Sequence, residues 1–399
     1  MMLATSKTVS PILSPWDAIR ALLGDAPPGA DPIDMTIGEP KHPMPDFVMA
    51  RMAEAAHGFG QYPPIRGTDA LRQAIADWAE RRYAIALDPQ RMVLALNGSR
   101  EGLYSAVVPA LERRPDIKAP LVAMPNPFYQ VYSAAATSAG AEPYFLSALP
   151  ETNFLPDLDA LENDPATLKR LVAFYLCSPS NPQGTLADRA YLVRAIALAR
   201  AYDFMLFCDE CYSEIYDSVA PCGGLEVASH DTGTLDNVIA FNSLSKRSNL
   251  PGLRSGFCAG DPAFIERFAT FRNVTCPQVP LPIQHASAAI WADEAHVVAN
   301  RQRYVEKFDA CDRLLGGLTG YQRPAGSFFL WLDMGQFGGG VAATVTLWKG
   351  CGVKVLPGAY LCHPSDDDVD PGADHIRIAL VHDLAITEVA LERLVSQLG

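Results

Sequence analysis

The chain has 399 residues, a formal net charge of −13 at pH 7 and 49% hydrophobic residues. The length and apolar content allow a large buried core, either in two or three domains or in one large α/β unit with a smaller one attached. The acidic balance argues against nucleic acid and anionic membranes as partners, because both select basic surfaces. The sequence pattern predicts no membrane helix and no signal peptide.

Nine cysteines, an odd number without framework-like spacing, predict a reducing cytoplasmic location. Cys208 and Cys211 form a CxxC pair, but no second pair of ligands for zinc lies nearby in the sequence. We therefore expect both cysteines to be packing residues and expect no metal site.

The first hundred residues predict an N-terminal arm followed by the start of an α/β alternation. The arm holds one short helix at 15–23 and ends near residue 30. A brief strand then breaks at Gly38, two helical patterns cover 46–58 and 68–82, and a strand at 92–96 is followed by a glycine turn. The helical pattern after that turn runs to Arg113.

Apolar runs then alternate with helical patterns of 10 to 15 residues, which predicts a mostly parallel, doubly wound sheet. The runs are at 121–124, 171–177, 204–208 and 238–241. Ligands of such sheets collect at the carboxyl ends of the strands. Four candidate residues follow predicted strands and are expected to share one site: Gly98, Asn181, Asp209 and Lys246.

From Pro282 a long helical pattern runs to Gly316–Gly317, and strands are expected at 327–333, 352–356 and 375–380 before a terminal helix. We predict three parts of the chain. Residues 1–45 form an N-terminal arm and part of a small domain, 46–294 a large domain, and 295–399 a C-terminal small α+β domain.

The segment 241–257 carries the most informative chemistry. Lys246 lies among serines, and Arg254 follows eight residues later. An amine beside hydroxyls and a guanidinium suits a phosphorylated aldehyde, which the amine binds as a Schiff base while the other groups hold the phosphate. A polar loop between two strands, with its charges in solvent, is the alternative reading of this segment alone.

In their order, these motifs resemble the class I/II aminotransferases of fold type I, which depend on pyridoxal phosphate, from about Gly38 to Arg377. The resemblance implies a large domain with a mostly parallel doubly wound sheet, a smaller α+β domain, pyridoxal 5′-phosphate as cofactor and a homodimer. It leaves a non-catalytic regulator that binds the cofactor as an alternative, although the short N-terminal arm and the acidic charge disfavour a DNA-binding module.

The resemblance assigns the catalytic roles as follows. Lys246 would form the Schiff base and then move the proton at the substrate Cα. Asp209 would keep the pyridine nitrogen protonated, and Tyr212 and Asn181 would bind the phenolic oxygen. The alternatives are a capping or surface acid for Asp209 and a core tyrosine for Tyr212.

Further residues match binding positions of the family. Tyr129 would stack on the cofactor ring, Arg377 and Gly38 would bind the substrate α-carboxylate, and Tyr62 would reach the phosphate bound to the neighbouring subunit. The phosphate itself would be held by Ser99, Arg100, Ser243, Ser245 and Arg254.

Within the family, the segment 243–257 is most similar to N-succinyldiaminopimelate aminotransferases of bacterial lysine biosynthesis. We therefore expect amino-group transfer between N-succinyl-LL-2,6-diaminopimelate and 2-oxoglutarate. The alternatives are an aspartate, aromatic or acetylornithine aminotransferase, or a pyridoxal-phosphate-dependent C–S lyase. Candidate ligands for the distal carboxylates are Lys41, Arg66 and Arg247.

Overall fold

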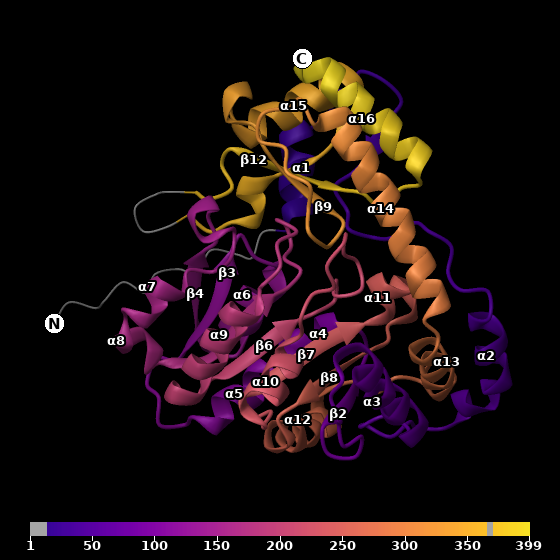
Figure 1. Cartoon of the computed structure of the whole chain (residues 1–399), viewed down its shortest axis with the longest axis vertical. Coiled ribbons are helices and arrows are strands. Elements are labelled where there is room, and N and C mark those ends of the chain that lie inside the picture. The colour runs from indigo at the N-terminus through magenta and orange to yellow at the C-terminus, as the bar shows by residue number, and fades with distance from the viewer. Residues whose placement is uncertain (1–13, 365–369) are drawn as a thin grey trace.

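A computed structural model describes residues 14–364 and 370–399. Its main feature is a seven-stranded sheet in the order β2-β8-β7-β6-β5-β3-β4. The strands are β2 (Val93–Leu96), β3 (Leu121–Asn126), β4 (Glu142–Ser147), β5 (Leu171–Cys177), β6 (Met205–Asp209), β7 (Val238–Ser243) and β8 (Gly256–Gly260). Figure 1 shows this sheet in the lower part of the molecule.

All neighbouring strands from β4 to β7 are parallel, whereas β8 is antiparallel to both β2 and β7. The prediction of a mostly parallel, doubly wound sheet is therefore confirmed. The reversed direction of β8 matters for the site. Its amino end lies at the same sheet edge as the carboxyl ends of the other central strands.

Helices cover both faces of the sheet, which explains why β5 is buried and apolar along its whole length. One hydrophobic cluster lies under α3 (Asp69–Tyr83), α9 (Arg189–Tyr202), α10 (Gly224–Thr232) and α13 (Leu281–Ala292). The cluster on the other face lies under α4 (Ser99–Ser105), α5 (Val107–Arg113), α6 (Gln130–Ser138) and α12 (Pro262–Thr275).

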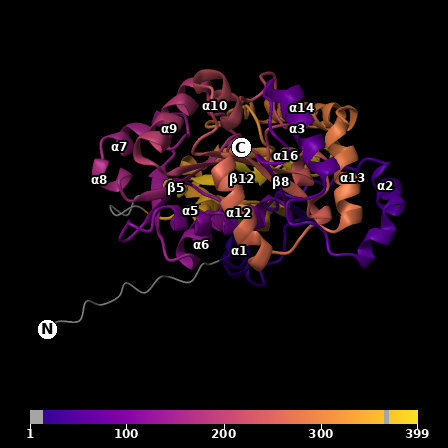
Figure 2. The same ribbon diagram turned by 90° about the horizontal axis from the view of Figure 1, so that it is seen from below.

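Short helices lie at the two ends of this layer. α2 (Val48–Glu54) lies beside α13 at one end, and α7 (Leu158–Glu162) and α8 (Pro165–Leu168) lie at the other, as two views at right angles show (Figure 1, Figure 2). The helical pattern expected through Arg113 is divided between α4 and α5 at Ala106.

The C-terminal part forms a second, smaller unit around a three-stranded antiparallel sheet, β11-β12-β9. These strands are β9 (Phe329–Asp333), β11 (Leu356–Pro357) and β12 (His375–Ala379). The helices packed on them are α14 (Ala295–Leu315), α15 (Gly339–Cys351) and α16 (Leu384–Leu398). The long helical pattern predicted from Pro282 is divided in two, because the chain leaves the helix between α13 and α14 at Asp293–Glu294.

The N-terminal segment joins this smaller unit. β1 (Ile33–Asp34) pairs in parallel with β10 (Val353–Lys354), and α1 (Pro15–Leu23) packs through Ile19 and Leu23 against Leu356 and Leu361. Figure 1 shows α1 beneath α15, on the side that faces the large sheet. The boundaries at residues 45 and 294 stay a prediction.

Candidate active site

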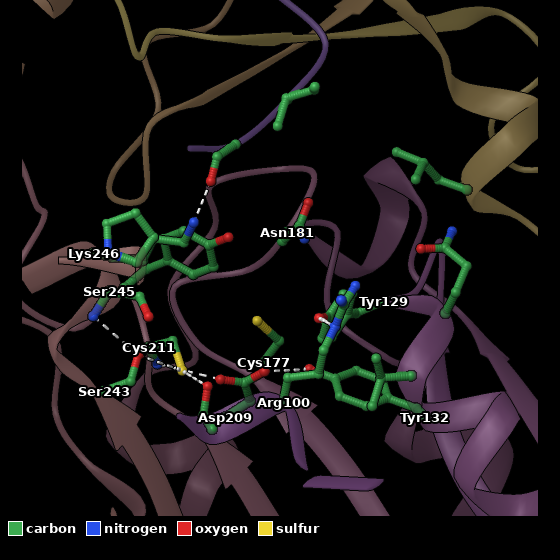
Figure 3. Close-up of a pocket in the computed structure, with 18 of the residues that line it drawn as sticks. Arg100, Tyr129, Tyr132, Cys177, Asn181, Asp209, Cys211, Ser243, Ser245 and Lys246 are labelled. Atoms are coloured by element: carbon green, nitrogen blue, oxygen red, sulfur yellow. Dashed lines mark hydrogen bonds between the residues drawn. The ribbon is translucent and has the colours of Figure 1, made fainter. Parts of the chain in front are cut away.

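A cavity of about 960 Å³ opens at the carboxyl edge of the seven-stranded sheet, and segments of the smaller unit close its other side. Two of the residues predicted for the site, Gly98 and Tyr62, are not part of its lining. The other predicted site residues all line it: Gly38, Ser99, Arg100, Tyr129, Asn181, Asp209, Tyr212, Ser243, Ser245, Lys246, Arg254 and Arg377. In Figure 3, Lys246 enters the cavity from one side, and Tyr129 and Tyr132 lie on the opposite side.

Lys246 lies on α11 (Leu244–Arg247), a single turn directly after β7. Ser243 caps this turn, because its Oγ accepts a hydrogen bond from the backbone N–H of Ser245 at 3.4 Å. The Lys246 Nζ donates to the carbonyl oxygen of Gly38. Burial lowers the pKa of Lys246 to about 8, and the positive charges of Arg377 and Arg254 act in the same direction. An amine with this pKa is partly neutral near pH 7, as a nucleophile or base requires.

Asp209 is the last residue of β6 and is 4% exposed. Its Oδ2 accepts a hydrogen bond from the Tyr132 hydroxyl at 2.6 Å, and its Oδ1 accepts from the backbone N–H of Cys211 at 3.3 Å. Burial raises the pKa of Asp209, and both hydrogen bonds oppose that rise. No arginine or lysine of the described ranges forms a salt bridge with this carboxylate. A buried carboxylate of this kind fits a ligand that carries a cationic nitrogen.

Arg254 and Gly98 form a close-fitting anion cradle. The Arg254 guanidinium donates to the carbonyl oxygens of Pro251 at 2.8 Å and Asn97 at 3.2 Å. A Cβ at Gly98, where φ is +77°, would lie only 2.3 Å from the Arg254 Nη2, so any side chain there would displace the guanidinium.

The hydroxyls of Ser99, Ser243 and Ser245 line the same cavity as Arg254. Ser99 also accepts a hydrogen bond from the Cys211 thiol at 2.9 Å. An arginine together with several small hydroxyls is a donor set that suits a phosphate dianion.

Arg377 comes from β12 of the smaller unit and is 4% exposed. Its Nη1 donates to the Asn181 Oδ1 at 3.0 Å and its Nη2 to the Thr36 carbonyl at 2.7 Å. Its Nε is buried without a hydrogen-bond partner, and its guanidinium lies 4.3 Å from the Phe329 ring centroid. Burial lowers the pKa of Arg377 to about 10. A buried guanidinium with an unused donor fits a carboxylate ligand.

Tyrosines form much of the remaining wall. Tyr129 immediately precedes α6 and accepts a hydrogen bond from the Arg100 Nε at 2.8 Å. Tyr212 is 8% exposed and packs edge-on against Phe328 and Phe329. Burial raises the pKa of Tyr212 well above 10, so its hydroxyl stays protonated at neutral pH and can donate.

Several lining residues were not anticipated, among them Trp16, Tyr132, Cys177, Cys211 and Phe329. Tyr132 follows Tyr129 by three residues, and this helical spacing was the available signal. Cys208 is buried in the sheet as expected, but the reading of Cys211 as a packing residue was incomplete, because this residue also lines the cavity.

Of the three suggested ligands for a distal carboxylate, Arg247 does not face the cavity. It is buried, it donates to the Ile290 carbonyl at 3.0 Å, and it pairs with Glu294 at 2.8 Å. Arg66 pairs with Glu266, and Lys41 lies 3.3 Å from His382. Tyr62 lies outside the cavity and is 98% exposed.

These features define a class of protein: an α/β enzyme that binds a phosphorylated aldehyde at the carboxyl edge of its sheet. Residues 30–394 match the family model of aminotransferase class I and II. The chain belongs to this family, and it is a pyridoxal-phosphate-dependent aminotransferase of fold type I.

Individual relatives support this assignment. An aminotransferase structure from Neisseria meningitidis Z2491 is 36% identical, covers 98% of both chains and superposes with a TM-score of 0.92. The LL-diaminopimelate aminotransferase of Syntrophobacter fumaroxidans is 31% identical over 92% of this chain and 91% of its own length. A 4-dedimethylamino-4-oxo-anhydrotetracycline transaminase of Streptomyces rimosus is 32% identical over 92% of this chain and 94% of its own.

The cavity fits pyridoxal phosphate on three counts. The cradle beside Gly98 suits the phosphate, the buried Asp209 carboxylate suits the protonated ring nitrogen, and Lys246 supplies the amine. The described residues contain no group of three or more His, Cys, Asp or Glu side chains that could hold a metal ion. No helix within the described ranges is long and apolar enough to span a membrane.

The lowered pKa of Lys246 predicts how cofactor binding depends on pH. Only the neutral amine attacks an aldehyde, so the rate at which cofactor-free protein gains the absorbance of the bound cofactor should rise with pH and level off above about 8. Stopped-flow absorbance at a fixed pyridoxal phosphate concentration measures this rate. Lys246→Ala should show no such absorbance change. A rate that keeps rising to pH 10 would contradict the lowered pKa.

The environment of Asp209 predicts the effect of removing its charge. Asp209→Asn keeps the size of the side chain but cannot hold a cationic ring nitrogen, so kcat should fall by at least about 10²-fold. Asp209→Glu keeps the charge and should retain more activity. Steady-state transamination with cofactor content measured on each variant separates lost chemistry from lost binding. Near-normal kcat in Asp209→Asn would show that the acid is only structural.

Proposed function

We propose that this chain transfers the amino group between N-succinyl-LL-2,6-diaminopimelate and 2-oxoglutarate in the lysine branch of bacterial amino-acid biosynthesis. The observation that carries the proposal is the charge of the cavity wall. Among the described lining residues four are cationic, namely Arg100, Lys246, Arg254 and Arg377, and only Asp209 is acidic. Such a wall selects substrates with several carboxylates.

The cationic side chains divide into separate tasks under this proposal. Arg254 with the serines binds the cofactor phosphate, and Arg377 binds the substrate α-carboxylate beside Gly38. Arg100 was expected to bind the phosphate, but its Nε contacts the Tyr129 hydroxyl at 2.8 Å. We propose instead that its terminal nitrogens bind an anionic group farther along the substrate. Lys41, Arg66 and Arg247 are not needed for this task.

The substrate's second amino group separates the two diaminopimelate candidates. The relative from Syntrophobacter fumaroxidans is named an LL-diaminopimelate aminotransferase, which makes the free diamino acid the second candidate. Free diaminopimelate carries a distal ammonium, and Asp209 is the only acid in the described lining. Asp209 is committed to the cofactor ring, so that ammonium would lack an anionic partner among the described lining residues of a single chain. Succinylation removes the ammonium and adds a carboxylate, which favours the acylated substrate.

The proposed roles of the side chains are those that the family resemblance assigns, and their positions around one cavity support them. The cofactor, when bound, supplies the electron sink that makes the substrate Cα–H acidic. Lys246, with its pKa of about 8, takes the proton from the substrate Cα. Asp209 would hold the cationic ring nitrogen of the bound cofactor, and Tyr212 and Asn181 would donate hydrogen bonds to its phenolic oxygen. Tyr129 would stack on the cofactor ring, as the resemblance implies.

We further propose that the enzyme is a cytoplasmic homodimer with two shared sites. Tyr62 is almost fully exposed in the single chain, and neighbouring Phe59 and Met49 are also exposed, at 62% and 58%. Apolar side chains concentrated in one segment are typical of an interface. The segment would then place Tyr62 against the phosphate bound to the partner subunit.

The substrate proposal predicts a ranking of amino donors. With 2-oxoglutarate as acceptor, kcat/KM for N-succinyl-LL-diaminopimelate should exceed that for free LL-diaminopimelate by about tenfold or more, since leaving the distal ammonium unpaired raises the barrier by at least about 1.4 kcal/mol. Aspartate and phenylalanine should be poorer donors still. Glutamate formation measured over this panel tests the ranking.

The variant Arg100→Met tests whether Arg100 binds the distal anionic group of the donor. It should lower kcat/KM for the succinylated donor while leaving cofactor content unchanged. If free LL-diaminopimelate is the better donor, the second candidate replaces the first. If aspartate or an aromatic amino acid is best, both diaminopimelate candidates are wrong.

The shared-site proposal predicts complementation between inactive subunits. A Tyr62→Ala subunit and a Lys246→Ala subunit should each be weakly active or inactive alone, but a mixed dimer contains one site without either change. Mixing the two variants under conditions of subunit exchange should therefore recover up to about a quarter of wild-type activity, as expected for random pairing in a two-fold dimer. Exchange verified by mass spectrometry without any recovery would argue against shared sites.

A further inference from the structure

A buried polar chain lies directly behind the Lys246 loop and outside the cavity lining. Its members are His42, Asn300 and Lys307, which are 9%, 3% and 1% exposed. Asn300 and Lys307 lie seven residues apart on α14, which places them on the same face two turns apart. Buried polar groups of this kind are retained only when their hydrogen bonds are made.

Consecutive hydrogen bonds link Lys307 to His42, His42 to Asn300, and Asn300 to the Lys246 turn. The Lys307 Nζ lies 2.8 Å from the Leu380 carbonyl oxygen and 2.7 Å from the His42 Nε2. The His42 Nδ1 lies 3.1 Å from the Asn300 Oδ1. The Asn300 Nδ2 then donates to the backbone carbonyls of Lys246 at 3.4 Å and Arg247 at 3.3 Å.

The protonation states of Lys307 and His42 determine the direction in which each hydrogen bond of this polar network is donated. Burial, together with the charge of Lys307, lowers the pKa of His42 to about 4, so the imidazole is neutral at neutral pH. Burial lowers the pKa of Lys307 only to about 7, so a proton shared by the pair resides on the lysine. The lysine then donates to Nε2, and the Nδ1–H of His42 donates to Asn300.

The direction of donation determines the orientation of the Asn300 amide. Because its Oδ1 accepts from His42, its Nδ2 must face the Lys246 and Arg247 carbonyls. Asn249 supports the same orientation, since its Nδ2 donates to the Asn300 Oδ1 at 3.0 Å and to the Pro43 carbonyl at 3.2 Å. A flipped amide would place donor against donor at both of these contacts.

The network of His42, Asn300 and Lys307 connects three segments of the protein that all contact the cavity. Leu380 lies just after β12, the strand that carries Arg377. His42 lies four residues after Gly38, whose carbonyl accepts from the Lys246 Nζ. The third segment is the Lys246 turn itself. These segments come from distant parts of the sequence, and α14 supplies the side chains that join them.

We propose that Asn300 is a positioning residue for Lys246 and that His42 and Lys307 orient Asn300. The hydrogen-bond network of these three residues couples the Lys246 turn to the segments that carry Gly38 and Arg377. The inference rests on the proposed function, since it takes Lys246 as the residue that carries the cofactor. Its role is to keep the Lys246 amine and the carboxylate-binding arginine in one relative geometry.

The test uses cofactor-loaded enzyme and four variants. Asn300→Leu and His42→Phe break the chain, Lys307→Met removes its first donor, and His42→Gln keeps one acceptor and one donor in the same order. The breaking variants should lower kcat by about 10²-fold, because misplacement of a reacting group by about 1 Å has that effect. They should also move the pH midpoint of the bound cofactor's absorbance by about one unit. His42→Gln should retain most of both properties.

Thermal unfolding of each variant and peptide mapping of the cofactor on the wild type separate the possible outcomes. Lower thermal midpoints in Asn300→Leu, His42→Phe and Lys307→Met, with kcat and the absorbance midpoint unchanged, would overturn the inference and leave the proposed function intact. If Asn300→Leu does not fold, the comparison of His42→Phe with His42→Gln decides. Absence of cofactor from Lys246 in the wild type would instead contradict the proposed function itself.

Discussion

The site depends on a buried carboxylate, Asp209, that forms no salt bridge with any described residue. Asp209 is removed from water at the end of β6, and the Tyr132 hydroxyl and the Cys211 N–H stabilise it only in part. Placing an ionised carboxylate in such surroundings is costly unless a cation completes the pair. A protonated pyridine nitrogen supplies that cation, so the protein gains most from this arrangement when the cofactor is bound.

The sheet topology then explains why the other groups lie around Asp209. Parallel strands bring their carboxyl ends to one edge, and the residues after β2, β3, β5 and β7 contribute Ser99, Tyr129, Asn181 and Lys246. Arg254 lies at the same edge although it precedes a strand instead of following one. It precedes β8, and because β8 is antiparallel to its neighbours, its amino end lies there. Arg377 and Gly38 come from the smaller unit and close the site from the other side.

Much of this arrangement was predictable from the sequence, and the parts that were not have physical reasons. Strand-ending residues such as Asp209 and Lys246 could be placed because the alternation of apolar runs and helices requires a parallel sheet. The antiparallel direction of β8 was not predictable, since an apolar run carries no information about strand direction. The break at Asp293–Glu294 was missed because the helical spacing of apolar residues continues on both sides. Tyr132 and the chain from Lys307 to Asn300 depend on contacts between distant segments. Arg247, which the sequence places beside Lys246, is directed instead to Glu294 on the far side of the turn.

Reduction of the purified enzyme with borohydride, followed by peptide mapping, shows which lysine carries the cofactor. We expect the reduced cofactor to be attached to a single lysine, Lys246. Recovery of the cofactor on another lysine, or on none, would contradict the site described here and every role assigned around it.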